Sequence, residues 1–284
     1  PLDFLVEADA LDGTLSNYKV LYITDRHVSS AASQRIAKWV EAGGILFATA
    51  GAGMFDEYNA SNKILRNLLG ADLQSLSEPK ASQVSMVKQD LPFANPIATV
   101  QWSGGRLETF GAQARLKLRK SSLITRKPEI LASFPDGYPA LLKRQSGKGT
   151  AYTCAFLPGL SYYRNATPMI PVDRSSSVKS LVHFLPTQFN DTARMLIDLP
   201  SQNLDKPVRC SAMLIESCIL DSPKGTALIL INWTRQPQKG LTVVLDNSFS
   251  SGPVQLASGG AVSRSGNRLT LDLETADAVL FKKE

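Results

Sequence analysis

The side chains that could perform chemistry in this sequence follow its predicted strands. The stretch "GGILFATAGAGMFDEYN" (residues 43–59) runs from an apolar strand into a Gly-rich turn, and a turn of this kind holds the nucleophile in many α/β enzymes. The turn AGAG (residues 50–53) supplies the small neighbours that such an elbow requires, but it contains no Cys, Ser or His. Thr49 lies in the strand, one residue before the turn, and so does not occupy the position of a nucleophile. We therefore predict no catalysis from this turn.

Two adjacent carboxylates, Asp56 and Glu57, follow the turn. Neighbouring side chains point apart in a helix or a strand, so these two do not form a natural acid/base pair. One interpretation is that they begin a helix, where the macrodipole favours negative charge. The other is a carboxylate in a cleft, because α/β folds keep their sites at the C-terminal ends of the sheet strands.

His27 and His183 are the only histidines. His27 ends the motif "TDRH" after the first predicted strand, so we expect it at the same sheet edge as Asp56, in a vestigial site or in a solvated loop. His183 lies in "LVHFL" and is expected to be a partly buried histidine with its hydrogen bonds satisfied. Two histidines this far apart are no metal-site signature, and we predict neither a metal nor a cofactor.

The segment "GLSYYRNATP" groups Tyr162, Tyr163 and Arg164 in what we expect to be a long surface loop, because two prolines follow. Aromatic faces beside an arginine suit sugar stacking or a protein interface. The alternative is that the rings pack the loop onto the body of the protein. The candidate ligand-binding residues are therefore His27, Asp56, Glu57, Tyr162, Tyr163 and Arg164.

The three cysteines, Cys154, Cys210 and Cys218, form no CxxC motif and no metal spacing. Each lies in an apolar, strand-like run and is expected to be a small buried hydrophobic residue. Cys210 and Cys218 could form a disulfide if their strands are neighbours, so the redox compartment stays open.

The composition is that of a globular protein with room for two domains: 284 residues, 43% hydrophobic and 20% charged. The net charge of +6 concentrates near residues 115–127, where Arg115, Lys117 and Arg119 alternate with leucines, as on the solvent face of a strand. A nucleic-acid groove would need interleaved aromatic residues, and this stretch has none, so we expect no nucleic-acid partner.

No apolar run approaches the roughly 20 residues that a membrane-spanning helix needs, and no signal-peptide pattern is present, so no membrane partner is predicted. The sequence begins with Pro, and we expect a piece of a longer chain or a processed product. The compartment cannot be assigned.

These residues must be positioned by a βαβ unit. An apolar strand (18–24) precedes a helix (29–42) that Ser29 or Ser30 can cap, with Ile36, Trp39 and Val40 on one face. Two glycines end the helix, and a second apolar strand follows. Strand, helix and strand of this length imply a parallel sheet.

Further along, residues 61–70 predict a second helix, and residues 82–152 read as an antiparallel extension of the sheet, because turn signals break up short alternating segments. An apolar strand ends in a Pro-Gly turn near residue 158, and helical segments follow from about residue 178. From about residue 208 the pattern is all strand, as in a β-sandwich. The predicted domains are 1–204 (α/β) and 205–284 (all-β).

Two stretches carry a family resemblance: "LDGTLSNYKVLYIT…WVEAGGILFATAGAGMFDEYN" and "DGYPALLKRQSGKGTAYTCAFLPGLSY". They resemble the beta-galactosidase trimerisation domain, which follows the catalytic barrel in a family of bacterial beta-galactosidases. The resemblance covers roughly residues 1–200. It implies a class I glutamine-amidotransferase-like, flavodoxin-like sheet with helices on both faces. Residues 208–284 look like the small β-domain that ends such glycosidases.

The resemblance implies a non-catalytic C-terminal module of a glycosidase. Such a module would act in homo-oligomer assembly, by resemblance a trimer, would shape a neighbouring active site, and would have an upstream catalytic domain as its partner. In the related amidotransferases a Cys occupies the elbow, where this sequence has Ala and Gly. Two alternatives stay open: a stand-alone carbohydrate-binding protein, with a saccharide as its partner, and an enzyme similar to trehalose-utilisation proteins.

Overall fold

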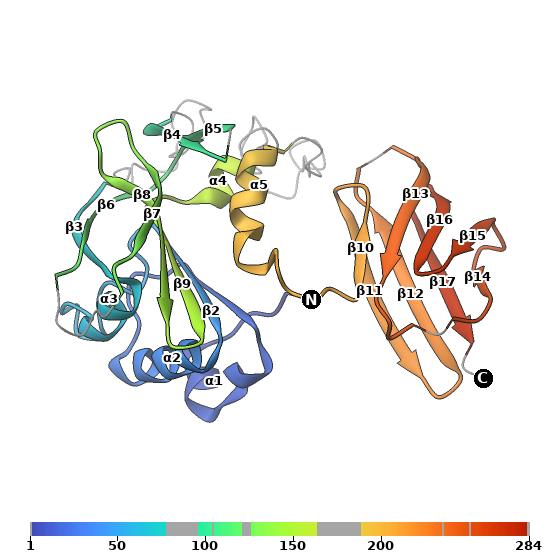
Figure 1. Cartoon of the computed structure of the whole chain (residues 1–284), viewed down its shortest axis with the longest axis horizontal. Coiled ribbons are helices and arrows are strands. Elements are labelled where there is room, and N and C mark those ends of the chain that lie inside the picture. The colour runs from blue at the N-terminus through green and yellow to red at the C-terminus, as the bar shows by residue number, and fades with distance from the viewer. Residues whose placement is uncertain are drawn as a thin grey trace, which may run out of the picture. The chain divides into compact units, whose positions relative to one another are not determined.

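A computed structural model describes residues 2–77, 96–103, 105–120, 126–163, 189–234, 236–249 and 251–282. Within this part the chain forms two compact units (Figure 1). The first unit contains residues 2–163 and 189–202, and the second contains residues 203–282. Each has its own cluster of buried apolar side chains.

The first unit is built around the predicted βαβ arrangement. Strand β1 (Val20–Ile23) pairs in parallel with β2 (Ile45–Thr49), and helix α2 (Ser30–Ala42) connects them. The Ser29 hydroxyl accepts a hydrogen bond from the Ala32 N–H at 3.3 Å, and Gly43 ends the helix at a φ of 129°. The prediction of a parallel pair is confirmed.

Three further strands complete the main sheet, in the order β1-β2-β9-β8-β7. Strand β9 (Gly149–Cys154) runs parallel to β2, β8 (Pro139–Ser146) pairs antiparallel with β9, and β7 (Glu129–Ser133) pairs antiparallel with β8. The carboxyl ends of β1, β2 and β9 therefore meet at one edge of the sheet, which we call the carboxyl edge.

The predicted antiparallel extension is only partly correct. Strand β3 (Ala71–Ser77) pairs with β6 (Gln113–Leu118), and β4 (Ala98–Trp102) pairs with β5 (Gly105–Thr109), in separate two-stranded sheets. Ala114 and Leu116 of β6 are buried in the core, while Arg115 and Lys117 between them are exposed. This ribbon thus packs one apolar face onto the core instead of joining the edge of the main sheet.

Apart from α2, the helices in the described part of the first unit are short. They are α1 (Glu7–Asp12), α3 (Lys63–Leu69), α4 (Pro158–Tyr163) and α5 (Asp191–Asp198), with 3₁₀ turns η1 (Thr14–Asn17) and η4 (Leu199–Ser201). The prediction of a turn and loop after β9 is wrong at its start, because Pro158 begins helix α4. Proline is tolerated in the first helical turn, where its missing N–H would have no partner in any case.

No helix in the described part of the chain is long and apolar enough to cross a membrane. The helical segment predicted near residue 178 and the loop from residue 164 lie outside the described residues.

The second unit consists of two four-stranded antiparallel sheets. One has the order β10-β13-β16-β15, from β10 (Val208–Cys210), β13 (Gln238–Leu245), β16 (Arg268–Leu273) and β15 (Val262–Ser265). The other has the order β11-β12-β17-β14, from β11 (Ile215–Ser222), β12 (Gly225–Asn232), β17 (Ala276–Lys282) and β14 (Val254–Leu256). Alternate residues of both sheets, such as Leu228 and Leu271, form one buried cluster.

The three cysteines are all free. Cys154 is buried as predicted, and burial raises the pKa of its thiol to about 12. The prediction is wrong for Cys218, which is exposed because it lies on the outermost strand of its sheet, and Cys210 is half-buried. Cys210 and Cys218 belong to different sheets, so their strands are not neighbours.

Candidate functional site

The loops after β1 and β2 meet at the carboxyl edge. His27 and Phe55 form an isolated parallel bridge, in which the Val28 N–H donates to the Phe55 carbonyl and the Phe55 N–H donates to the Arg26 carbonyl, both at 3.0 Å. The His27 ring lies 5.7 Å from the Phe55 ring, and its Nε2 is 2.9 Å from Asn59 Oδ1. His27 and Asp56 therefore lie in adjoining loops, as expected from the sequence.

The Gly-rich turn after β2 has a strained backbone and carries no nucleophilic side chain. Ala50 has a φ of 45°, in the left-handed region that side chains rarely adopt, and its N–H donates to the Cys154 carbonyl at 2.8 Å. Gly51 and Gly53 also have positive φ. The side chain at this strained residue is a buried methyl group. Neighbouring Thr49 is buried too, and its hydroxyl has no hydrogen-bond partner in the described part of the chain.

The two carboxylates after the turn have separate local partners. Asp56 Oδ1 accepts hydrogen bonds from the N–H groups of Tyr58 and Ala60, at 3.0 and 2.9 Å, and so closes a turn. Glu57 Oε2 accepts a hydrogen bond at 2.7 Å from the N–H of Ser30, the first residue of α2. Hydrogen bonds from the backbone N–H groups of Glu57 itself and of Ser30 lower the Glu57 pKa.

The expectation that these acids begin the following helix is therefore wrong, because α3 starts only at Lys63. Glu57 instead lies at the N-terminus of α2, where a Glu7 oxygen also accepts a hydrogen bond from the Ser29 N–H at 2.8 Å. Negative charge is favourable at the N-terminus of α2 because the positive end of the helix macrodipole lies there. Sequence spacing missed this contact because the carboxylate of residue 57 returns to a helix that begins 27 positions earlier.

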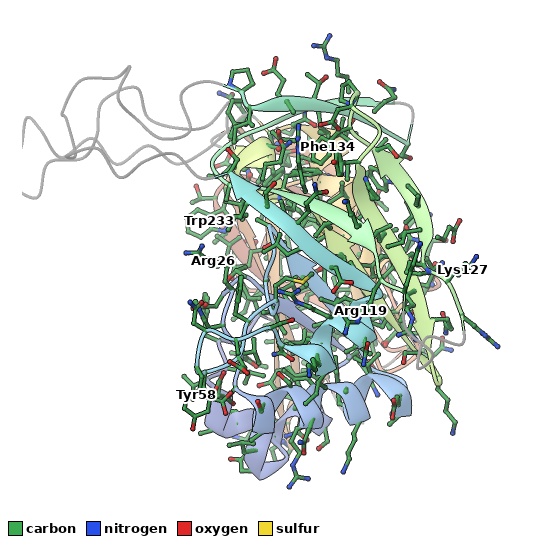
Figure 2. The ribbon with its side chains drawn as sticks, turned by 90° about the vertical axis from the view of Figure 1, so that its left-hand side faces the viewer. Arg26, Tyr58, Arg119, Lys127, Phe134 and Trp233 are labelled. Atoms are coloured by element: carbon green, nitrogen blue, oxygen red, sulfur yellow. The ribbon has the colours of Figure 1, made fainter. Side chains whose placement is uncertain are left out.

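Among the described residues, the polar groups at the carboxyl edge do not form an assembled catalytic set. Asp25 Oδ1 is 3.8 Å from His27 Nδ1, too long for a hydrogen bond, and both side chains are largely exposed to solvent. No cluster of metal-ligating side chains occurs among the described residues. Tyr58, whose side chain is 84% exposed, projects from the same loop (Figure 2).

The aromatic group near residue 162 lies in a helix, not in the predicted loop. The Tyr162 ring stacks on Phe189 with centroids 4.4 Å apart, and burial raises the Tyr162 pKa. One face of this ring is therefore covered. Tyr163 lies in α4 as well, but its side chain, Arg164 and His183 are outside the described residues. Within the part of the chain that the structure describes, no hydrogen bond or ring contact connects Tyr162 to His27, Asp56 or Glu57.

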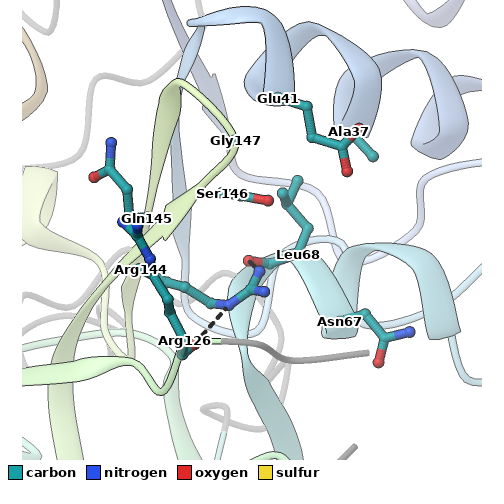
Figure 3. A pocket seen from close by; sticks show the side chains of 9 residues that line it. All are labelled: Ala37, Glu41, Asn67, Leu68, Arg126, Arg144, Gln145, Ser146 and Gly147. Carbon is teal, nitrogen blue, oxygen red and sulfur yellow. Dashed lines mark hydrogen bonds between the residues drawn. The ribbon is translucent and has the colours of Figure 1, made fainter. Parts of the chain in front are cut away.

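Sequence analysis missed a cavity of about 660 Å³ at the opposite edge of the sheet (Figure 3). It lies between the last turns of α2 and α3 and the turn that joins β8 to β9. The lining residues are Ala37, Glu41, Asn67, Leu68, Arg126, Arg144, Gln145, Ser146 and Gly147.

Arg144 is the unusual residue in this cavity, because it is only 6% exposed and no carboxylate of the described residues lies within ion-pair distance of it. Its Nη1 donates to the Leu68 carbonyl at 2.7 Å and its Nε donates to the Arg126 carbonyl at 3.3 Å. Burial lowers its pKa, and the Glu41 carboxylate acts in the opposite direction. Because Leu68 belongs to the last turn of α3, Arg144 caps that helix, and we assign it a structural role. The sequence contains one signal for the burial of Arg144. In a strand, Arg144 lies on the same face as Ala140 and Leu142, two apolar residues.

The comparison with protein families decides what this chain is. A family model described as the beta-galactosidase trimerisation domain matches residues 3–168, which is more than half of the chain. The chain belongs to the beta-galactosidase trimerisation domain family. A comparison with curated proteins gave no match.

Three solved beta-galactosidase structures superpose on this chain. Gan42B, a GH42 beta-galactosidase from G. stearothermophilus solved as a catalytic mutant, superposes with a TM-score of 0.59 at 16% identity. A cold-adapted beta-galactosidase from Rahnella sp. R3 gives the same TM-score and identity. A beta-galactosidase from Bacillus circulans sp. alkalophilus gives 0.56 at 15% identity.

The superpositions cover 96, 95 and 94% of this chain but only 33% of each of the three relatives. The chain therefore spans about a third of the length of these proteins. At this identity the likeness concerns the fold, a mixed α/β architecture.

Proposed function

We propose that this chain is a non-catalytic C-terminal module of a beta-galactosidase-like protein, which assembles the oligomer and shapes a neighbouring active site. The observation that carries the proposal is the family match over residues 3–168, joined to a turn after β2 whose strained residue is Ala50. The turn at the end of β2, where α/β enzymes can hold a nucleophile, has only a methyl group at its strained residue.

The proposed partners are copies of the same chain, in a trimer, and an upstream catalytic domain. The relatives are about three times as long as this chain, which supports an upstream partner on the same polypeptide. We further assign residues 1–204 to an amidotransferase-like, flavodoxin-like domain and residues 205–284 to a β-sandwich. The parallel β1-α2-β2 unit and the shared core of the two C-terminal sheets support these assignments.

Light scattering of the chain at several concentrations, together with an aryl galactoside assay, tests this proposal. We expect a particle whose mass is a multiple of three times 30.8 kDa and no release of the aryl group. A particle of one chain at all concentrations, or hydrolysis that copurifies with the chain and is lost on Asp56→Asn or Glu57→Gln, would contradict it.

A saccharide site at the carboxyl edge is a second candidate function. The exposure of the Tyr58 ring, next to Asp56 and Glu57 and in the loop that contacts His27, favours it, because sugars stack on exposed aromatic faces. Tyr162, Tyr163 and Arg164 remain the second proposed group. We expect Tyr58→Ala to weaken galactose binding in an NMR titration. If the second group binds the sugar instead, Tyr162→Ala weakens binding. Equal affinity in both variants and the unmodified chain would remove this candidate.

A further inference from the structure

Strand β11 forms an open sheet edge in the C-terminal unit, outside the family match that ends at residue 168. It pairs with β12 at all eight positions, from Ile215 opposite Asn232 to Ser222 opposite Gly225, without a bulge. No strand in the described part of the chain pairs with its other side. Ile219 and Leu220 are 38 and 55% exposed. The strand contains no proline, lysine or bulge, and its charged residues are Glu216 and Asp221.

The hydrogen-bond pattern fixes which backbone groups of β11 point towards β12. The Trp233 N–H donates to the Leu214 carbonyl at 2.9 Å, so residues 214 and 233 occupy a hydrogen-bonded pair. Because such pairs alternate along an antiparallel ladder, the even-numbered residues of β11 bond to β12. The N–H and C=O groups of Ile215, Ser217 and Ile219 therefore point to the side of β11 away from β12.

This alternation restricts how β11 could pair with itself. Residues that face each other in an antiparallel pair must both be hydrogen-bonded or both not, so odd positions pair with odd ones and even with even. Two such registers bring seven residues of each strand into contact. One is centred on Cys218 and the other on Ile219.

The two registers differ in side-chain matching. Centring on Ile219 places Ile219 opposite Ile219, Cys218 opposite Leu220, Ser217 opposite Asp221 and Glu216 opposite Ser222. Apolar then faces apolar, polar faces polar, and no acid faces an acid. Centring on Cys218 places Glu216 opposite Leu220 and Ile215 opposite Asp221, which pairs acids with apolar side chains. Cross-strand matching therefore favours the Ile219 register.

We propose that β11 pairs antiparallel with β11 of a second copy of this chain, with Ile219 facing its own counterpart across a twofold axis. The pairing joins two four-stranded sheets into one of eight strands and satisfies the open backbone groups. This pairing does not involve the first unit. Added to an assembly through the first unit, it would double the number of chains in the particle.

Disulfide trapping tests the register. In a Cys218→Ser background, Ile219→Cys places two thiols at a hydrogen-bonded pair with Cα atoms about 5.5 Å apart, within disulfide range. Ser217→Cys in the same background is the matched control, since its thiols lie four residues apart along the strands, about 14 Å. The native Cys218 thiols would sit on a diagonal of about 7–8 Å, beyond comfortable disulfide geometry.

Mild oxidation is therefore expected to give a covalent dimer from Ile219→Cys, and much less from Ser217→Cys or from the unmodified chain. Equal cross-linking in all three, or cross-linking only through Cys218, would overturn the proposal.

Light scattering tests the contact itself. Ile219→Lys puts an uncompensated charge at the twofold axis, and we expect it to halve the particle mass. Ser265→Lys, on the exposed edge strand β15, is the matched control and should leave the mass unchanged. Circular dichroism checks that both variants fold. If folded Ile219→Lys has the same particle mass as the parent chain, the β11 pairing is overturned. If the parent chain shows no threefold mass, only the function proposed above is contradicted.

Discussion

At the scale of single residues, Asn62 does the most to hold the candidate site together. It is buried, its Oδ1 accepts the Leu65 N–H at 3.1 Å, and its Nδ2 donates to the Val28 carbonyl at 3.0 Å and to Ser33 Oγ at 2.8 Å. It therefore caps α3 and connects that helix to the loop carrying His27.

Replacing Asn62 by Ala removes the cap and leaves the buried Val28 carbonyl without this partner. Adding the usual costs of both losses, we expect Asn62→Ala to reduce the free energy of unfolding by about 2–4 kcal/mol. Urea denaturation measures the effect. Ser61→Ala, at an exposed neighbouring position, serves as a control and should cost less than about 0.5 kcal/mol. Equal losses in the two variants would show that Asn62 does not connect these elements.

The strained backbone at Ala50 predicts an unusual order of side-chain tolerance. A β-branched residue is poorly accommodated at positive φ, so Ala50→Val should lower the free energy of unfolding by at least about 2 kcal/mol. Ala50→Gly relieves the strain but loses a buried methyl group, so it should differ from the parent by less than about 1 kcal/mol. Thermal denaturation of both variants decides the point. A more stable Val variant would mean that the turn is not held in this conformation.

At the scale of elements, close backbone approaches explain why certain glycines are required. A Cβ added to Gly149, the first residue of β9, would lie 2.0 Å from the Val40 carbonyl and 2.2 Å from the Gly44 carbonyl. Both neighbours are backbone atoms and cannot rotate away. This contact brings the start of β9 close to the C-terminal end of α2.

Gly149→Ala is therefore expected to destabilise the chain strongly, by about 3 kcal/mol or more, since relief requires α2 to move away from the sheet. Gly159→Ala is a matched substitution in helix α4, where an added Cβ meets nothing within 4 Å. There we expect a gain of about 0.5–1 kcal/mol from the higher helix propensity of Ala. Chemical denaturation of the pair gives both values, and similar effects at the two positions would contradict the packing described.

The N-terminus of α2 predicts a pH dependence. The lowered pKa of Glu57 means that its stabilising contribution is present above its unfolded value of 4.5 and is lost as pH falls through the lower folded value. Glu57→Gln should therefore unfold with a shallower loss of stability below about pH 4.5 than the parent chain. Urea midpoints from pH 6 to pH 3 measure this. Parallel pH profiles would show that the contact with Ser30 carries no electrostatic contribution.

Local signals in the sequence predicted elements that depend on near neighbours. The stripe of Ile36 and Val40 and the stop at Gly43 gave the βαβ unit correctly, because a helix and its caps are determined within a few residues. Helix α4 was missed because Pro158 followed by Gly also reads as a turn. The separate β3–β6 ribbon was missed because strand pairing depends on partners far away in the chain.

Some contacts of the candidate site could likewise be predicted from the sequence, and others could not. The proximity of His27 and Asp56 followed from parallel topology, because strands that run in the same direction end at the same edge. The contact of Glu57 with α2 and the capping of α3 by Arg144 could not be predicted, since each joins residues whose separation in sequence carries no periodic signal. Such contacts depend on the final packing of the elements.

At the scale of the whole molecule, the two buried clusters contain no residue in common. Leu46 belongs to the cluster of the first unit and Leu230 to that of the second, and both are fully buried. Trp39 and Trp102 lie in the first unit, whereas Trp233 lies in the second, where its indole N–H donates to Glu216 at 2.8 Å. The chain thus carries separate reporters for the two units.

Separate cores predict separate unfolding. Removing a large buried side chain costs about 2–5 kcal/mol, and that cost should fall only on the unit that contains it. We expect calorimetry to resolve two transitions, with Leu46→Ala lowering the midpoint of one and Leu230→Ala lowering that of the other. Trp233 fluorescence should follow only the Leu230-sensitive transition. If both variants shift a single transition equally, the two units fold as one cooperative body, and the predicted domain division near residue 204 fails.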